Sequence, residues 1–227
     1  MKGLRPCVAE VIGTFFLCFA GIAAICSTAA PINSGAGLVG IALAHGLALS
    51  VAVNTFGGLS GAHFNPAVTC GMLVTGRIKL PLAIGYVISQ LAGSTLAALA
   101  CKSIFPAEAV GAVKLGIPLP GGSWVTTEVL LLVEAILTFL LMTAIFGTAV
   151  DERGKAVKIG GFGIGLAVTF DILAGGPVTG ASMNPARSFG PALVHGDFQL
   201  HWCYWAAPLA GAVVAALLYH HFLLKED

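Results

Sequence analysis

Charged residues are scarce in this sequence. Only 9% of its 227 residues are Asp, Glu, Lys or Arg, whereas roughly 25% is usual for soluble domains. Hydrophobic residues make up 57% and the mean hydropathy is +0.95. With a formal net charge of +1 and only short loops, the sequence offers no basic surface for nucleic acid. The composition is that of a membrane protein with several spans.

Paired cysteines and metal-binding patterns are also lacking. The six cysteines include no CxxC pair, and most lie in or beside apolar runs. Because buried free cysteine behaves as a small hydrophobic residue, we predict reduced, packed side chains and no zinc or redox centre. No nucleophile–base arrangement suggests an enzyme, and we expect neither a cofactor nor a metal. The cysteines are Cys7, Cys18, Cys26, Cys70, Cys101 and Cys203.

Long apolar runs supply the membrane spans. A run of about 20 residues crosses roughly 30 Å of hydrocarbon as an α-helix, which also satisfies its own backbone hydrogen bonds. The runs do not alternate polar and apolar residues, so a transmembrane β-barrel is disfavoured. We predict spans at residues 7–27, 35–56, 81–101, 125–150, 160–174 and 201–223.

The basic residues predict the orientation of these spans. Six spans place both termini on one side, and cytoplasmic loops are enriched in Lys and Arg. Eight basic residues fall on the side of the termini and two on the other. The first set is Lys2, Arg5, Arg77, Lys79, Arg153, Lys155, Lys158 and Lys225, and the second is Lys102 and Lys114. We therefore expect cytoplasmic termini, and the short terminal segments favour the plasma membrane.

Two phrases occur twice along the chain. AEVIGTFFL at 9–17 is echoed by VEAILTFLL at 133–141, and GAHFNPAVT at 61–69 by GASMNPARS at 180–188. Three spans per half make the second half enter the membrane in the opposite direction, which is an inverted repeat. We expect one channel domain over residues 1–227, with repeats at roughly 1–105 and 122–227, and a site where the halves meet.

Each NPA phrase starts a helix that is too short to span. Residues 65–75 cover about 16 Å of helix, half of the hydrocarbon thickness. Asparagine suits the N-cap and proline the first helical position. Two such half-helices would point their positive ends at each other near the membrane centre, which disfavours cations. The pore-centre residues are Asn65, Pro66, Ala67, Asn184, Pro185 and Ala186.

With these motifs the chain resembles the aquaporin, or major intrinsic protein, family over essentially its whole length. The resemblance implies an all-α membrane protein in which six helices and two re-entrant half-helices form an inverted repeat. It further implies a homotetramer in the lipid bilayer with one pore per subunit. Asn65 and Asn184 would orient a passing water molecule and so interrupt a proton wire.

The resemblance also implies an outer constriction of four residues. Counting from the two NPA motifs, these are His45, Ile172, Ala181 and Arg187. This set resembles the ammonia-permeable branch of plant tonoplast-type aquaporins and their animal relatives. We therefore expect water and ammonia as permeants, with hydrogen peroxide as a further candidate, and rejection of ammonium by the permanent charge of Arg187.

A glycerol facilitator is the nearest alternative. Ser188 follows Arg187 where glycerol facilitators carry Asp, and Tyr204-Trp205 resembles the aromatic pair of water-selective members. These positions argue against glycerol as a substrate, although the apolar constriction leaves glycerol transport as an alternative. A junction or adhesion protein of the same fold would need a specialised exposed surface, and the short loops show none.

A proton-coupled secondary transporter is the third hypothesis, because Glu10 and Glu134 are ionisable groups at membrane depth. Their symmetric placement favours another role, in which each accepts backbone N–H bonds from the non-helical segment before its half-helix. We expect His63 and Gln90 to line or brace the pore. Asp171 could brace the outer vestibule or lie at a subunit contact.

Small residues allow close helix contacts in membranes, where lipid does not press helices together. The predicted crossing points are Gly57, Gly58, Gly85, Gly160 and Gly161.

Overall fold

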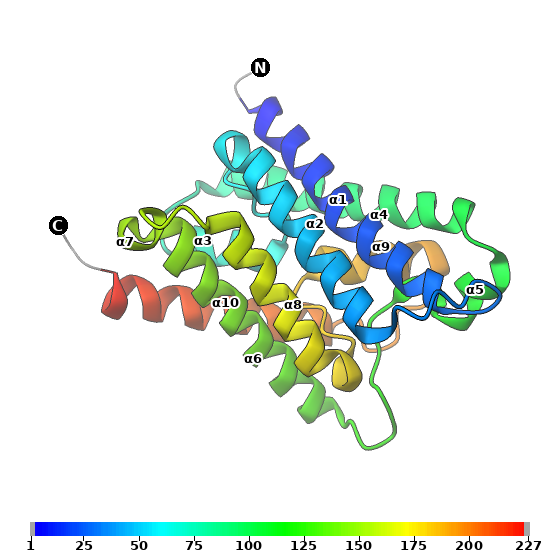
Figure 1. Ribbon diagram of the computed structural model, residues 1–227. Coiled ribbons are helices and arrows are strands. Elements are labelled where there is room, and N and C mark those ends of the chain that lie inside the picture. The colour runs from blue at the N-terminus through cyan, green and yellow to red at the C-terminus, as the bar shows by residue number, and fades with distance from the viewer. Residues whose placement is uncertain (1–2, 225–227) are drawn as a thin grey trace.

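The computed structural model describes residues 3–224, and every regular element within them is a helix. Lys2 and Lys225, which entered the charge count, lie outside the described residues. Six helices are long and apolar enough to cross a membrane. They are α1 (Leu4–Thr28), α2 (Gly37–Ser60), α4 (Leu80–Ile104), α6 (Thr127–Ile145) with its π-helical extension η2 (Phe146–Val150), α8 (Gly160–Thr179), and α10 (Cys203–Leu218) with η3 (Tyr219–Leu223). In Figure 1 both chain ends lie toward one end of the bundle, away from α5 (Ala107–Ala112).

Two further helices begin at the NPA motifs. They are α3 (Pro66–Val74) with 9 residues and α9 (Pro185–His195) with 11. At about 1.5 Å per residue neither can cross the hydrocarbon layer. The predicted class, an all-α membrane protein with six spans and two half-helices, is confirmed. Three short connecting elements were not expected from the sequence, namely α5, η1 (Lys114–Gly116) and α7 (Glu152–Lys155).

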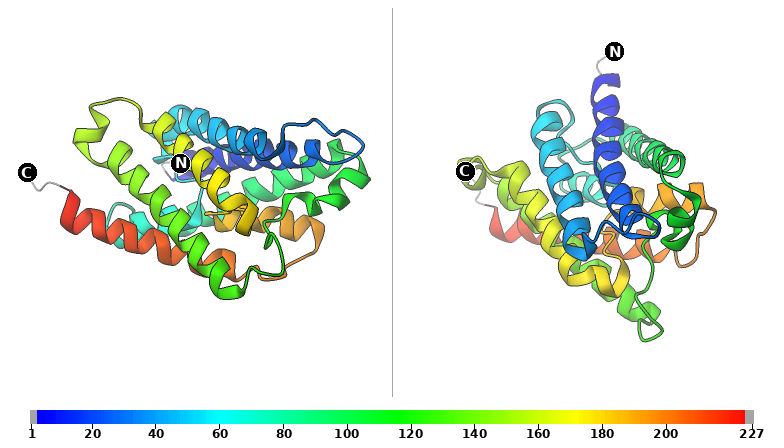
Figure 2. Two further views of the ribbon diagram at one scale, coloured as in Figure 1. Left: turned by 60° about the horizontal axis from the view of Figure 1, so that its bottom comes forward. Right: turned by 45° about the vertical axis from the view of Figure 1, so that its right-hand side comes forward.

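The helices pack in equivalent pairs. α1 packs on α4 and α2, while α6 packs on α10 and α8. The two halves then meet along α2 and α8, and each half-helix packs against a long helix of the other half: α3 on α10, and α9 on α4. Figure 2 shows the long helices inclined to one another, with α10 in red beside α6 in green. This exchange of half-helices brings the two NPA motifs together at the centre.

Glycine permits the closest helix crossings, but mostly not at the predicted positions. An added Cβ at Gly57 or Gly58 would meet no described atom within 4 Å. Of the predicted set, Gly161 is covered most tightly, by the Asn54 side chain, while a Cβ at Gly85 would lie 3.1 Å from Cys7 Sγ of α1 and one at Gly160 would lie 3.3 Å from Thr148 O. The tight crossings lie instead at Gly93, over an α1 carbonyl, and at Gly211, over an α6 carbonyl. The face that a glycine turns toward its neighbour decides its role, and adjacency of two glycines does not reveal that face.

The fifth span is longer than the predicted residues 160–174. The predicted span stops just before Gly-Gly-Pro at 175–177, yet α8 continues through Pro177 to Thr179. It closes at Gly180, whose φ of +81° only glycine adopts without strain and whose N–H bonds back to Gly176 O at 3.0 Å. The second span likewise runs on to Ser60. The extra turns carry hydroxyl groups that the centre of the fold uses.

Candidate functional site

The two NPA asparagines cap the half-helices. Asn65 Oδ1 accepts the N–H of Ala67 at 2.8 Å, and Asn184 Oδ1 accepts those of Ala186 and Arg187 at 2.9 and 3.2 Å. In each helix the proline occupies the first turn, where no N–H is needed. Sequence and local structure agree here because capping depends only on neighbouring residues.

The same asparagines also join the two halves. Asn65 Nδ2 donates to Met183 O at 2.8 Å, and Asn184 Nδ2 donates to Phe64 O at 2.9 Å. An amide nitrogen carries two hydrogens, so each carboxamide retains one donor beyond this bond. Both asparagines line the central cavity. The site therefore offers two fixed N–H donors at the point where the half-helices meet.

The segments leading into the asparagines have a strained backbone. Ala62 and Phe64 have φ values of +54° and +50°, and Ala181 and Met183 have +44° and +53°. Residues with a Cβ rarely adopt this left-handed region, so the surroundings must hold it in place. Equivalent residues of the two halves share these φ values, so the strained conformation is a repeated feature of the site.

Glu10 holds the first of these segments. Its carboxylate accepts the N–H groups of His63 and Phe64 at 3.0 and 2.7 Å, and also bonds Ser60 Oγ and Gln90 Nε2 at 2.7 and 2.8 Å. Each bond to an ionised acceptor is worth about 1.5–3 kcal/mol. Glu10 is fully buried and lies outside the cavity lining.

Glu134 holds the second segment in the same way. It accepts the N–H groups of Ser182 and Met183 at 2.9 and 2.8 Å and the Thr179 hydroxyl at 2.7 Å. Tyr204 OH donates to Thr179 O at 2.7 Å, as Tyr86 OH does to the equivalent carbonyl of the first half. Both glutamates therefore have the contacts of braces and line no solute path.

His63 and Gln90 have different positions around the first motif. His63 lines the cavity, and its Nδ1 is 3.0 Å from Thr69 Oγ1. Gln90 lies behind the lining and donates both to Glu10 and to Thr69 Oγ1 at 3.0 Å. Of the two, His63 is placed to meet a solute, whereas Gln90 only braces.

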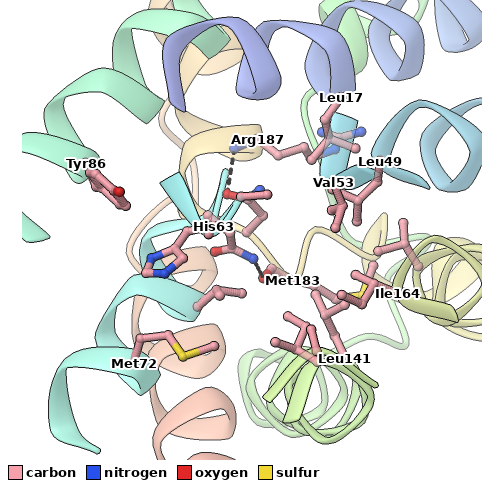
Figure 3. A pocket seen from close by; sticks show the side chains of 18 of the residues that line it. Leu17, Leu49, Val53, His63, Met72, Tyr86, Leu141, Ile164, Met183 and Arg187 are labelled. Carbon is pink, nitrogen blue, oxygen red and sulfur yellow. Dashed lines mark hydrogen bonds between the residues drawn. The ribbon is translucent and has the colours of Figure 1, made fainter. Parts of the chain in front are cut away.

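A cavity of about 300 Å³ passes the two asparagines. We name its two ends by position: the inner end lies on the side of the chain termini, and the outer end lies on the side of η1. Figure 3 shows His63, Met72 and Tyr86 on one side of the cavity and Arg187 reaching toward Leu17 on the other. Between the polar groups the walls are apolar, including Leu49, Leu141 and Ile164. Such walls bind water weakly and leave the few polar groups to orient it.

His45, Ile172, Ala181 and Arg187 all line the outer part of this cavity. Arg187 Nη1 donates to Gly116 O at 2.7 Å, and its Nε has no hydrogen-bond partner among the described residues. Arg187 is only 4% exposed. A nearly buried cation thus shares the cavity lining with Ile172 and Ala181, two side chains without polar atoms.

The imidazole of His45 has a defined tautomer. Its Nδ1 is 2.8 Å from Ile41 O, and since a carbonyl only accepts, Nδ1 carries the hydrogen in the neutral ring. Nε2 is then an acceptor. The ring edge that carries Nε2 lies over Gly21 of α1, where any Cβ would overlap it. Gly21 therefore makes the space that His45 occupies.

Asp171 is fully buried in α8, and neither carboxylate oxygen has a hydrogen-bond partner within residues 3–224. It lies outside the cavity lining. The side chain is packed inside the helix bundle.

Sequence reasoning missed several residues of the site. The Arg187 partner is a backbone carbonyl in the connection between the halves, which carries no side-chain signal. Ser60 and Thr179 were also missed, although both occupy the same position before an NPA motif and aligning the halves would have found them. Arg77 lines the inner end and entered the sequence analysis only as a loop charge.

No three His, Cys, Asp or Glu side chains within residues 3–224 lie close enough to hold a metal ion. Each of the six cysteines is unpaired, and four of them are buried.

Comparison with known proteins identifies relatives over nearly the full chain. The family model described as "Major intrinsic protein" matches residues 1–219. The chain is 43% identical to Aquaporin TIP4-4 of Zea mays, covering 98% of this chain and 88% of the relative, and 41% identical to Aquaporin TIP2-1 of Arabidopsis thaliana, covering 100% and 90%. It is 40% identical to Aquaporin-8 of Notomys alexis, covering 98% and 84%.

Among solved structures, the aquaglyceroporin from Plasmodium falciparum matches with a TM-score of 0.86 over 97% of both chains. At 23% identity this likeness shows the fold alone.

Proposed function

The chain belongs to the major intrinsic protein family, and from this premise we propose that it conducts water and ammonia through the cavity between its two asparagines. As a member of the aquaporins it is a passive multi-pass membrane channel and not an enzyme. The observation that carries the solute assignment is the outer ring of His45, Ile172, Ala181 and Arg187, which combines two polar groups with two apolar walls.

Water conduction without proton conduction rests on the asparagine pair. Asn65 and Asn184 each offer one N–H to the cavity, so a water molecule at the centre accepts hydrogen bonds there and points its own hydrogens outward. Two half-helix N-termini add positive potential at the same point. A water held in this orientation cannot pass a proton along the file, and a cation is repelled.

Ammonia passage rests on the shape and chemistry of the outer ring. Ile172 and Ala181 add width and remove polar atoms, while Nε2 of His45 accepts and Arg187 donates. Ammonia can both donate and accept a hydrogen bond, as water can, and therefore meets the same two groups. Ammonium cannot accept from Arg187 and is repelled by its charge. Hydrogen peroxide, also small and neutral, is a further candidate permeant.

A glycerol facilitator remains the alternative, and specific contacts oppose it. Ser188 is buried and bonds Pro185 O at 2.9 Å, so it offers no group to a polyol. A proton-coupled transporter is opposed by Glu10 and Glu134, whose carboxylates are committed to backbone N–H groups away from the cavity. Their role in this proposal is to hold the two strained segments.

Assembly and orientation complete the proposal. We propose that repeats at about 1–105 and 122–227 form one channel domain, that four copies associate, and that the termini face the cytoplasm. The equivalent pairing of α1 with α4 and α6 with α10 supports the repeats. Family resemblance supports the tetramer, which light scattering of the purified protein tests. The excess of basic residues beside the termini supports the orientation.

Stopped-flow light scattering on proteoliposomes tests the solutes directly. We expect rapid osmotic water flux, ammonia flux well above that of empty liposomes, little glycerol flux and no proton current. Ammonia flux equal to that of empty liposomes would refute the outer-ring argument and leave the water channel standing. Glycerol flux as fast as ammonia flux would favour the facilitator instead.

A further inference from the structure

The cavity carries a second fixed charge besides Arg187. Arg77 lines its inner end, on the far side of the asparagine pair. These two arginines are the charged side chains of the lining, and no carboxylate is among the described residues that form it. A solute that enters from either end therefore meets a positive charge before it reaches the centre.

Local structure fixes where Arg77 lies. It follows α3 after a turn at Gly76, whose φ is +71°, and its N–H donates to Met72 O at 2.8 Å. The guanidinium carbon then lies 5.4 Å from the centre of the Phe146 ring at the start of η2. Phe146 is fully buried and makes an aromatic contact with Tyr219 at 5.5 Å. The cation is held over a rigid aromatic platform at the mouth.

The nearby acidic residue Asp151 does not neutralise the charge of Arg77. Asp151, beyond Phe146, accepts from the backbone and side chain of Arg153 and from Tyr219 OH at 3.2 Å. These contacts, above all the Arg153 side chain, lower the pKa of Asp151 to about 2, so the pair is ionised and jointly neutral. Within residues 3–224 no ion pair involves Arg77. Its charge therefore acts on the mouth.

We propose that Arg77 is a second specificity-determining residue, which lowers the local concentration of cations at the inner mouth before they reach the asparagines. The inference rests on the proposed channel function and deepens it. Arg187 acts in a nearly dry constriction, whereas Arg77 acts through water. Its effect is therefore modest, roughly two- to threefold per unit charge at about 7 Å, and is screened by salt over a Debye length of about 10 Å at 0.1 M.

A thiol probe at the mouth measures this potential. Ala149 belongs to η2, whose Phe146 lies under Arg77, and it also lines the cavity, so Ala149→Cys places a reactive group at this end. The full-length protein in detergent is modified with two methanethiosulfonates of similar size, one bearing trimethylammonium and one sulfonate, and rates are followed by intact mass. The same chain without Ala149→Cys gives the background from its native cysteines.

Arg77 speeds the anionic reagent and slows the cationic one, so the ratio of their rate constants changes by the square of the effect on each. We expect this ratio to fall about four- to ninefold at low salt with Arg77→Gln and further with Arg77→Glu. The difference should largely vanish at 1 M salt, where the Debye length is about 3 Å. The matched control is Lys79→Gln and Lys79→Glu, because Lys79 is exposed two residues away and lies outside the lining. Those changes should leave the ratio unchanged.

Three results would overturn the role of Arg77. The ratio of rate constants could stay unchanged in the Arg77 variants, it could change as much in the Lys79 variants, or neither reagent could modify the cysteine at position 149. Water flux of the same variants separates this inference from the channel function. An unchanged ratio with normal water flux would refute only the proposed role of Arg77. Absence of water flux in the wild-type protein would refute the proposed channel function itself.

Discussion

The two sides of the asparagine pair carry equivalent rings of different chemistry. Counting from each asparagine, the inverted repeat matches each outer-ring residue with one of an inner ring. The outer ring is His45, Ile172, Ala181 and Arg187, and the inner ring is Ile164, Val53, Ala62 and Val68. All eight line the cavity. The fold thus builds two similar rings, and only one of them contains polar groups.

Burial does not distinguish the rings. Arg187 and His45 are 4% and 3% exposed, and their counterparts Val68 and Ile164 are 3% and 4% exposed. The difference lies in what supports the polar groups. His45 packs against Gly21, whose counterpart in the second half is the larger Ile145. Arg187 donates to a carbonyl from the connection between the halves. Selectivity therefore requires space and a partner as well as the polar residue.

The largest expected effect concerns the braces that hold both rings in register. Glu134→Gln replaces an acceptor oxygen with a donor that faces N–H groups of Ser182 or Met183, so we expect a loss of about 2–4 kcal/mol. Glu10→Gln should cost less, because the amide of Gln90 beside it has an oxygen without a partner and can turn to accept. Within residues 3–224 the carboxylate of Glu134 accepts hydrogen bonds from Thr179, Ser182 and Met183 and from no amide side chain.

Thermal unfolding of the purified variants in one detergent measures this difference. Glu128→Gln, at the exposed start of α6, is the control and should shift the midpoint little. If Glu10→Gln proved the more damaging change, the proposed compensation by Gln90 would be wrong.

The next effect concerns charge rejection. Arg187→Val gives the outer ring the residue that the inner ring already has, and we expect ammonium conductance to rise at least tenfold. A tenfold change needs only about 1.4 kcal/mol, much less than a unit charge exerts in a poorly hydrated constriction. Current across planar bilayers with ammonium chloride measures it. Val68→Ala is the control and should leave the ammonium conductance at the wild-type level. Water flux should stay at the wild-type level in both variants.

Much of this arrangement was predictable from the sequence because the signals are local or repeated. The spans, the half-helix caps and the inverted repeat were found from hydropathy, from Asn-Pro and from duplicated phrases. The ends of the long helices were predicted less well. The fifth span was predicted to stop at residue 174, whereas α8 continues to Thr179, whose side chain and carbonyl make tertiary hydrogen bonds. The predicted crossing points at Gly57 and Gly58 failed for a similar reason, because a crossing depends on which face each helix presents.

The polar partners of the site could not be predicted in the same way. Gly116 supports Arg187 through its carbonyl, and every residue has a carbonyl. Gly21 makes room for His45 because it has no Cβ. The sequence contains 30 glycines, and nothing in it marks Gly21 as the one beside His45. What the sequence predicts is therefore the ring residues, while the space and the partners that make them selective require coordinates.

A smaller effect distinguishes the solutes. His45→Phe removes the Nε2 acceptor from the outer ring and adds bulk, so we expect ammonia flux to fall several-fold and water flux to fall less. Stopped-flow measurements on one preparation give both rates. Ile164→Phe, the equivalent change in the inner ring, is the control and should reduce both fluxes in proportion. Equal losses of ammonia and water in His45→Phe would mean that His45 acts only through its size.

The smallest effect tests the space behind His45. Gly21→Ala adds a methyl group that overlaps the imidazole edge, so the ring should shift toward the cavity and ammonia flux should fall by about half, with a smaller loss for water. Gly57→Ala, which meets open space in α2, is the matched control and should change neither flux. The double variant decides the mechanism: in a His45→Ala background no ring remains to be displaced, so Gly21→Ala should then have no effect. If the methyl group still slowed ammonia in that background, Gly21 would act through the helix packing of α1. The outer and inner rings of the cavity would then differ by their polar residues alone.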